Sequence, residues 1–161
     1  MVYILMICMV VPLLLLIPML EKQSRLLLGF VLGGMVLAVC AYEINSVVCA
    51  LFSLSGPELS ITAAPIVEEI LKALPVLFFA LLVSDDRKLV LQLAMASGIG
   101  FAILENAFLL ITYVDQVDIA WAVVRGISTS LSHGICTMIV GSGIVYVRKQ
   151  KKLFYTGTFA L

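Results

Sequence analysis

Long apolar runs alternate with short polar connections along the whole chain. Five runs are complete and a sixth begins near the end of the sequence, with approximate bounds of 1–20, 26–51, 62–83, 89–114, 119–147 and from 153 onward. Each complete run can cross a bilayer as an α-helix, which needs about 20 apolar residues. None shows the alternation of a membrane β-barrel strand. The pattern predicts an all-α, polytopic transmembrane bundle of about five complete spans and a truncated sixth, forming a single integral membrane domain over residues 1–161.

The charged residues of the connections predict the orientation. Basic residues gather at 21–25, 85–88 and 148–152, whereas the connections at 53–60 and 115–118 contain none. Cytoplasmic connections of membrane proteins are enriched in lysine and arginine, so the first, third and fifth connections are expected on the cytoplasmic side. The N-terminus is then expected outside.

Composition supports this interpretation and excludes other classes. Of the 161 residues, 63% are hydrophobic and 12% are charged, which is about half the charged fraction of a soluble domain. Ten basic and ten acidic residues give a formal net charge of zero, so the charge balance does not indicate a nucleic-acid partner. The lipid bilayer is the expected surrounding, and the most informative charges are those that fall inside it.

Seven ionisable side chains fall inside the apolar runs. They are Glu43, Glu68, Glu69, Lys72, Glu105, Arg125 and the only histidine, His133. With a rise of about 1.5 Å per residue, they lie about 9–21 Å from the outer end of their spans. Ionisable groups at membrane depth face the bundle interior and mark a pathway or a site. Because four helices deliver such groups to one layer, a single site is predicted in the outer half or the middle of the membrane.

The third span is the richest in these groups. Pro65 suits the first turn of a helix, which places Glu68 and Glu69 near the positive end of the helix dipole. Lys72 follows by four and three residues, so it can reach either carboxylate. Adjacent helix positions point about 100° apart, so only one of the two carboxylates can face a cavity squarely. A buried ion pair that fixes the helix register is the structural alternative.

Closely spaced glycines occur in two spans. Gly29 and Gly33 make a GxxxG step in the second span, and Gly98 and Gly100 stand in the fourth. Small residues let helix backbones approach closely in membranes. Both pairs are therefore expected at helix contacts.

The fourth and fifth spans add a carboxylate and a histidine. Glu105 is followed by Asn106 in the fourth span. In the fifth span, polar or small residues recur every four positions, at Arg125, Thr129, His133, Thr137 and Gly141. Such a stripe must be buried in protein. Alternatively, Glu105 only pairs with Lys72 or Arg125, and Glu43 is a structural counter-charge.

Residue types decide which protease chemistry such a membrane site can support. An aspartyl mechanism needs two intramembrane aspartates, but every aspartate lies in a connection, and the zinc-binding HExxH pattern is absent. Ser142 lies about 13 Å along the helix from His133, too far to serve as its nucleophile. A glutamate-rich site with one histidine remains. Glu68 is the expected general base, assisted by Glu69, Glu105 and His133.

A metal and a metal-free site both fit the residue pattern. The four intramembrane glutamates exceed Lys72 and Arg125 by two charges. A divalent ion such as zinc would balance this excess, with Glu69, Glu105 and His133 as candidate ligands, and protonation of two carboxylates would balance it equally. Supporting roles are expected for Lys72, Asn106, Arg125 and Thr137.

Three motifs follow one another on successive spans. They are Pro-Ile-Val-Glu68-Glu69-Ile-Leu-Lys72, then Gly-Phe-Ala-Ile-Leu-Glu105-Asn106, then Arg125 with Ser-His133-Gly-Ile-Cys-Thr137. Together they resemble the PrsW family of intramembrane proteases, which is similar to CAAX prenyl endopeptidases and bacteriocin-processing membrane enzymes. The resemblance covers about residues 25–161. Glu68 and Glu69 match the family's double-glutamate motif, Glu105-Asn106 matches its second motif, and His133 matches its histidine motif.

This resemblance implies an activity and a location. Family members are proposed to cleave membrane-anchored proteins, such as anti-sigma factors, at the outer side in response to envelope stress. The chain is thus expected to be a multi-pass protein of the bacterial plasma membrane that performs regulated intramembrane proteolysis. The family pattern ends with a further helix that carries a histidine followed by asparagine, whereas this sequence ends at Leu161. The last helix is expected to be truncated, and the chain to be inactive as given if that histidine is a ligand or base.

Two other classes of protein also place ionisable residues inside a membrane. A small proton- or ion-coupled transporter would use Glu105 in a proton relay, although the sequence shows no internal repeat and few spans for a carrier. Proton-coupled uptake that is lost on Glu105→Gln would favour it. A non-enzymatic membrane scaffold would use the charges only to pair helices, and exchanging Glu68 and Lys72 would then preserve its function. The sequence indicates no oligomeric state.

Overall fold

The structure is a computed structural model that describes residues 21–84, 86–113 and 118–158, with side chains described as far as residue 150. Every element in these ranges is a helix: α2 (Lys22–Phe52), α3 (Gly56–Ile61), α4 (Ala63–Leu82), α5 (Arg87–Thr112) and α6 (Ile119–Thr158). The predicted all-α class is therefore confirmed. The first predicted span, residues 1–20, lies outside the described residues.

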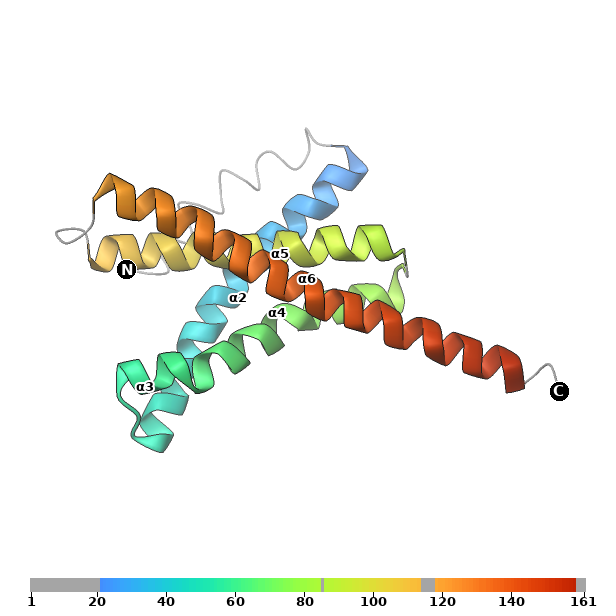
Figure 1. The fold of residues 1–161 in the computed structure, drawn as a ribbon, viewed down its shortest axis with the longest axis horizontal. Helices are drawn as coiled ribbons and strands as arrows, with labels where there is room; N and C mark the ends of the chain where they lie inside the picture. Colours follow the sequence, from blue (N-terminus) through green and yellow to red (C-terminus); the bar gives the residue numbers. More distant parts are fainter. Residues whose placement is uncertain (1–20, 85, 114–117, 159–161) are drawn as a thin grey trace.

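The four long helices cross one another, and α5 is the centre of the packing (Figure 1). α5 has its most extensive contacts with α6 and α2, and α4 contacts all three of these helices. The short helix α3 packs against α4 and α2. The C-terminal part of α6 extends beyond the other helices (Figure 1).

Residues of the polar connections set the helix ends. The Asp86 Oδ1 atom accepts the backbone N–H of Lys88 at 3.0 Å at the start of α5. The Asp118 Oδ1 atom accepts the backbone N–H of Trp121 at 2.7 Å at the start of α6. α2 ends at Phe52, and the residue that caps it, Ser53, has a left-handed φ of 52°. Because the first N–H groups of a helix have no partner within it, these aspartates stabilise the helix starts.

Glycines bring α5 within backbone contact of its two neighbours. A Cβ atom at Gly98 would overlap the carbonyl of His133, and one at Gly34 would overlap the carbonyl of Ser97. The helix contact predicted at Gly98 is therefore confirmed. At the GxxxG step of α2, a Cβ atom at Gly29 or Gly33 would meet no described atom within 4 Å, so the helix contact expected there stays a prediction. Gly34, the next residue along, faces α5 instead.

Two groups of buried apolar side chains hold the helices together. The first, here called the apolar cluster, consists of Val76 and Ala80 of α4, Val90 and Ala94 of α5, and Val145 of α6. The second joins α2 to α5 through Leu32, Met35, Val39 and Leu104. Both consist of short or medium side chains, which permits the close packing on which helix association in membranes depends.

Three of the described helices are long and apolar enough to cross a membrane: α2, α5 and the Ile119–Gln150 part of α6. Their length and composition are those of membrane-spanning helices. α4 has 20 residues and carries Glu68, Glu69 and Lys72. The total of five or six spans and the outer N-terminus stay predictions.

The end of the fifth predicted span differs from the structure. The sequence pattern places a connection at 148–152 and a new span from 153, whereas α6 is continuous from Ile119 to Thr158. Its segment 148–152 contains only arginine, lysine and glutamine. These residues are strong helix formers, so the polar segment does not interrupt the helix.

Candidate functional site

Lys72 lies at the centre of the polar residues and is fully buried, with a relative exposure of 0%. Its Nζ atom donates to Glu69 Oε1 at 2.7 Å, one helical turn earlier on α4. The same atom lies 2.7 Å from His133 Nδ1 on α6. A buried ammonium group requires such partners, because leaving a charge unpaired away from water is very costly.

His133 carries the contact onward to α5. Its Nε2 atom lies 2.8 Å from Glu105 Oε2. Arg125 of α6 donates through Nη2 to Glu105 Oε1 at 3.1 Å. Together these residues form what is here called the charged row: Glu69, Lys72, His133, Glu105 and Arg125. The row joins α4, α6 and α5, and its two carboxylates and two cations balance with a neutral histidine.

Phe101 covers one side of the charged row. The centroid of its ring lies 4.5 Å from Lys72 Nζ and 5.2 Å from the centroid of the His133 ring. Phe101 is 2% exposed. A cation over an aromatic face is attracted by the ring's quadrupole, so Phe101 stabilises the ammonium while keeping water away from it.

A second hydrogen-bonded set holds the start of α6 against α5. Asn106 Nδ2 donates to Thr129 Oγ1 at 2.6 Å, and the Thr129 hydroxyl lies 2.6 Å from the backbone carbonyl of Arg125. Thr137 donates to the carbonyl of His133 at 2.8 Å. The predicted polar stripe of α6 therefore faces the bundle, and Thr137 is buried at 1% exposure. These contacts explain Asn106, Thr129 and Thr137 as positioning groups.

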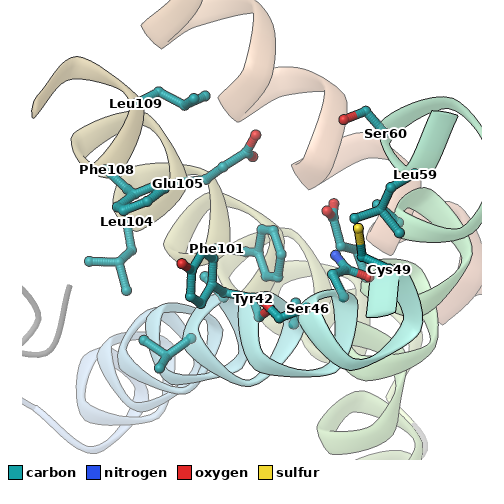
Figure 2. Close-up of a pocket in the computed structure, with 16 residues that line it drawn as sticks. Tyr42, Ser46, Cys49, Leu59, Ser60, Phe101, Leu104, Glu105, Phe108 and Leu109 are labelled. Atoms are coloured by element: carbon teal, nitrogen blue, oxygen red, sulfur yellow. The ribbon is translucent and has the colours of Figure 1, made fainter. Parts of the chain in front are cut away.

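A cavity of about 510 Å³ opens beside the charged row. Its lining comes from four helices: α2 with Tyr42 and Ser46 among others, α3 with Leu59 and Ser60, α4 with Ala64 and Glu68, and α5 with Phe101, Glu105 and Phe108 among others. Figure 2 shows Glu105 and Phe101 on one side of the cavity and Leu59 and Ser60 on the other. Most of the lining is apolar, so the two glutamates are its strongest polar groups.

The two adjacent glutamates of α4 have different surroundings. Glu69 binds Lys72, whereas Glu68 lines the cavity and has no hydrogen bond or ion pair with any described residue. This division matches the expectation that only one of them can face a cavity. Glu105 lines the cavity and also pairs with Arg125. The pairing with Arg125 is the one that a purely structural role for Glu105 predicts. Glu43 of α2 is exposed and does not belong to the charged row.

Sequence reasoning missed the contribution of α3 to the cavity. The segment 53–60 was expected to be a plain connection, but it contains a helical turn whose Leu59 and Ser60 reach the cavity. A signal was present: Ser55 and Glu58 have the spacing of a capping box, with a proline between them. In the structure the Ser55 backbone N–H donates to Glu58 Oε2 at 2.8 Å.

Comparison with known protein families assigns the chain to one of them. Residues 22–161 match the family described as PrsW family intramembrane metalloprotease. The chain belongs to the PrsW family. Neither a curated protein nor a solved structure matches it significantly. The suspected family is thus confirmed, and this PrsW-family chain carries an intramembrane protease domain.

The description of the PrsW family as metalloproteases is compatible with a bound metal. The residues of this chain do not converge as a set of ligands, however. In the ranges 21–84, 86–113 and 118–150, no three or more His, Cys, Asp or Glu residues gather in a way that could hold an ion. Of the three candidate ligands, Glu69 and Glu105 lie toward opposite ring nitrogens of His133. Lys72 fills the space between Glu69 and the ring.

Proposed function

We propose that this PrsW-family chain is an intramembrane endopeptidase that hydrolyses a peptide bond of a membrane-anchored protein near the outer side of the membrane. The substrate class that we propose is a single-span regulatory protein such as an anti-sigma factor in the bacterial plasma membrane. The observation that carries the proposal is Glu68, which has no hydrogen bond or ion pair with a described residue and lines a cavity of about 510 Å³ beside the charged row.

Glu68 is the general base in this proposal. Its carboxylate accepts a proton from a water molecule in the cavity while the water oxygen attacks the scissile carbonyl carbon. When the tetrahedral intermediate collapses and the C–N bond breaks, the same proton passes to the leaving amine. A base must be able to reach water, and Glu68 is the one carboxylate of α4 whose oxygens are not engaged by another described side chain.

The charged row assists this reaction by position and charge. Glu105 lines the same cavity and is oriented by His133 on one oxygen and Arg125 on the other. Lys72 and Glu69 fix the opposite side of the histidine ring. Preorganised charges of this kind stabilise developing charge without having to reorganise during the reaction. Asn106 joins α5 to α6 through Thr129, and Thr137 bonds to the backbone carbonyl of His133 within α6.

The cavity lining fits a peptide segment rather than a small polar solute. Aromatic and aliphatic side chains dominate it, with Tyr42, Phe101 and Phe108 as the aromatic members. An unwound, uncharged stretch of a transmembrane segment matches this surface. The expected depth of Glu68, about 9 Å from the outer end of its span, supports cleavage near the outer side.

The proposal is tested by expressing the chain together with a panel of epitope-tagged single-span membrane proteins that includes anti-sigma factors. Cleavage products are followed by immunoblotting. Glu68→Gln keeps the shape of the side chain and removes its basicity, so cleavage should fall by about 100-fold or more. The matched control is Glu43→Gln, which makes the same change at an exposed glutamate of α2.

Accumulation of the chain is measured in the same samples, because a loss of protein would imitate a loss of activity. Cleavage by Glu68→Gln at the wild-type rate would overturn the role of Glu68. A panel in which the wild-type chain produces no fragment, although it accumulates, would count against the proposed activity itself.

A further inference from the structure

The position of Lys72 restricts the protonation of His133. A lysine ammonium has only donor hydrogens, so a ring nitrogen that lies 2.7 Å from it must accept. His133 Nδ1 therefore carries no proton. The ring proton then resides on Nε2, which donates to Glu105 Oε2 at 2.8 Å. The geometry thus selects the neutral ring with its proton on Nε2.

The ammonium group of Lys72 also occupies the space that a metal ion bound to His133 Nδ1 would need. Zinc binds histidine nitrogen at about 2.0–2.1 Å, along the direction of its lone pair. At Nδ1 that direction leads to Lys72 Nζ, which is simultaneously bonded to Glu69 Oε1. At Nε2 it leads to the carboxylate of Glu105, which also binds Arg125. An ion on either nitrogen would have to displace a cation or break an existing bond.

Within the charged row, one buried carboxylate oxygen has no described partner. Glu69 Oε2 is buried and makes no hydrogen bond with the described residues. This oxygen could supply only one metal ligand, and its carboxylate is already paired with the ammonium of Lys72. Since zinc sites in proteins use three or four protein ligands, this oxygen does not by itself make a metal site.

We infer that Lys72 is the resident cation of this site and a positioning residue for His133: it holds the ring neutral with its proton on Nε2, and it takes the place of a metal ion between Glu69 and His133. The consequence of this inference for catalysis rests on the proposed function. The ordered ring helps to keep both oxygens of Glu105 engaged. Glu68 is left as the carboxylate of the site that is available to water.

The state of the ring is measured directly by nitrogen NMR. His133 is the only histidine of the chain, so labelling with ¹⁵N-histidine gives two ring signals for the purified full chain in detergent micelles. At neutral pH we expect one protonated nitrogen, Nε2, and one unprotonated nitrogen, Nδ1, shifted by the hydrogen bond from Lys72. Two protonated nitrogens, or a proton on Nδ1, would overturn the inference.

Substitution of the lysine tests its role in the same spectrum. Lys72→Met removes the ammonium at similar length, and the Nδ1 signal should move toward the position of a nitrogen without a hydrogen-bond donor. Lys72→Arg retains a cationic donor and should preserve the proton on Nε2. Lys88→Met makes the same change at an exposed lysine of α5 and should leave both signals unmoved. An unmoved Nδ1 signal in folded Lys72→Met would contradict the positioning role.

Metal binding is probed with Co²⁺, whose visible absorption reports its ligands. The measurement uses the wild-type chain, so it does not depend on whether a variant folds. This chain should show no absorption bands from Co²⁺ bound by histidine. Bands with one ion per chain that disappear in Glu69→Gln and in His133→Ala would overturn the inference.

Both measurements are made without a substrate. A failure of the proposed endopeptidase activity would therefore appear as absent cleavage with the ring state and the Co²⁺ result unchanged. A failure of the inference would appear in the spectra even if the chain cleaves its substrate.

Discussion

Two neighbouring regions of the same helix bundle differ sharply in what they contain. On α4 the buried Lys72 is followed by Val76 and Ala80 at intervals of one helical turn. On α6 the half-buried His133 is followed on the same face by the buried Thr137 and Val145. The charged row is therefore followed by the apolar cluster on the same face of both helices, with Thr137 and Gly141 between the two regions on α6.

The difference shows how a membrane bundle separates stability from chemistry. The apolar cluster is built from small, closely packed side chains that are 0–1% exposed and offer no polar group. The charged row is held by specific hydrogen bonds, each of which fixes the direction of a functional group. In lipid, packing and hydrogen bonding both stabilise helix contacts. Substitutions in the two regions should therefore have separable effects on unfolding and on cleavage.

The contact between the two regions should be the most sensitive point. Gly98→Ala adds a Cβ atom that overlaps the backbone of His133, so α5 and α6 must move apart. We expect a loss of about 1–3 kcal/mol in the free energy of unfolding from this overpacking. Cleavage should also fall, by about 100-fold, because a displacement of about 1 Å at reacting groups has an effect of this size.

The matched control for Gly98→Ala is Gly143→Ala on α6, where an added Cβ atom would meet nothing within 4 Å. That variant should be neutral, or more stable by up to about 1 kcal/mol because alanine is the better helix former. Unfolding in mixed detergent micelles and cleavage per folded chain measure the two effects. Equal behaviour of the two glycine variants would refute the close contact at His133.

A substitution within the apolar cluster should affect stability alone. Val76 is 1% exposed, and Val76→Ala removes two methyl groups from the cluster, so we expect a loss of about 1 kcal/mol in the free energy of unfolding. Cleavage per folded chain should stay at the wild-type level. The control is Val147→Ala on α6, a valine that is 54% exposed and whose truncation should have little effect on either measurement. A large loss of cleavage in folded Val76→Ala would contradict the prediction that the apolar cluster affects stability alone.

The smallest effect is expected outside both regions, at α3. Hydrogen bonds from the Ser55 hydroxyl and backbone hold the pKa of the Glu58 carboxyl below its ordinary value of 4.5. A depressed pKa in the folded state means that Glu58 stabilises α3 at pH values above 4.5, and that this contribution disappears as the pH falls through the folded value.

Hydrogen exchange at residues 56–61 measures this effect. Protection of these amides should decrease on acidification below the ordinary pKa of glutamate, and the decrease should be absent in Glu58→Gln. An identical pH response in Glu58→Gln would assign the change to another group. Cleavage need not change, except as far as the mobility of Leu59 and Ser60 alters the cavity wall.

Much of the architecture follows from local signals along the chain. The apolar runs predict α2, α5 and most of α6, and the aspartates at 86 and 118 stand at helix starts. The polar segment at 148–152 misled because charge density marks a membrane boundary but does not end a helix. The GxxxG step of α2 does not indicate the contact with α5, which is made by the adjacent Gly34, because a glycine pattern shows that a close approach is possible and not which residue faces a given neighbour.

The candidate site was predictable as a set of residues but not as an arrangement. Depth alone gathers the ionisable side chains into one layer, and their identity excludes aspartyl and HExxH chemistry. The partners were not predictable in the same way: Lys72 could reach Glu68 or Glu69, and in the structure it binds Glu69 and His133. Contacts between helices depend on how each helix is rotated about its axis, which no spacing within one helix reveals.

By itself, the sequence determined that this is a helical membrane protein and that its motifs belong to one protease family, and it predicted a shared depth for the ionisable groups. Only the tertiary structure decided which of the two adjacent glutamates faces a cavity and which is neutralised by a lysine. The physical reason is that helix periodicity fixes the angle between Glu68 and Glu69, whereas the packing of α4 against α2, α5 and α6 decides which way that helix is turned.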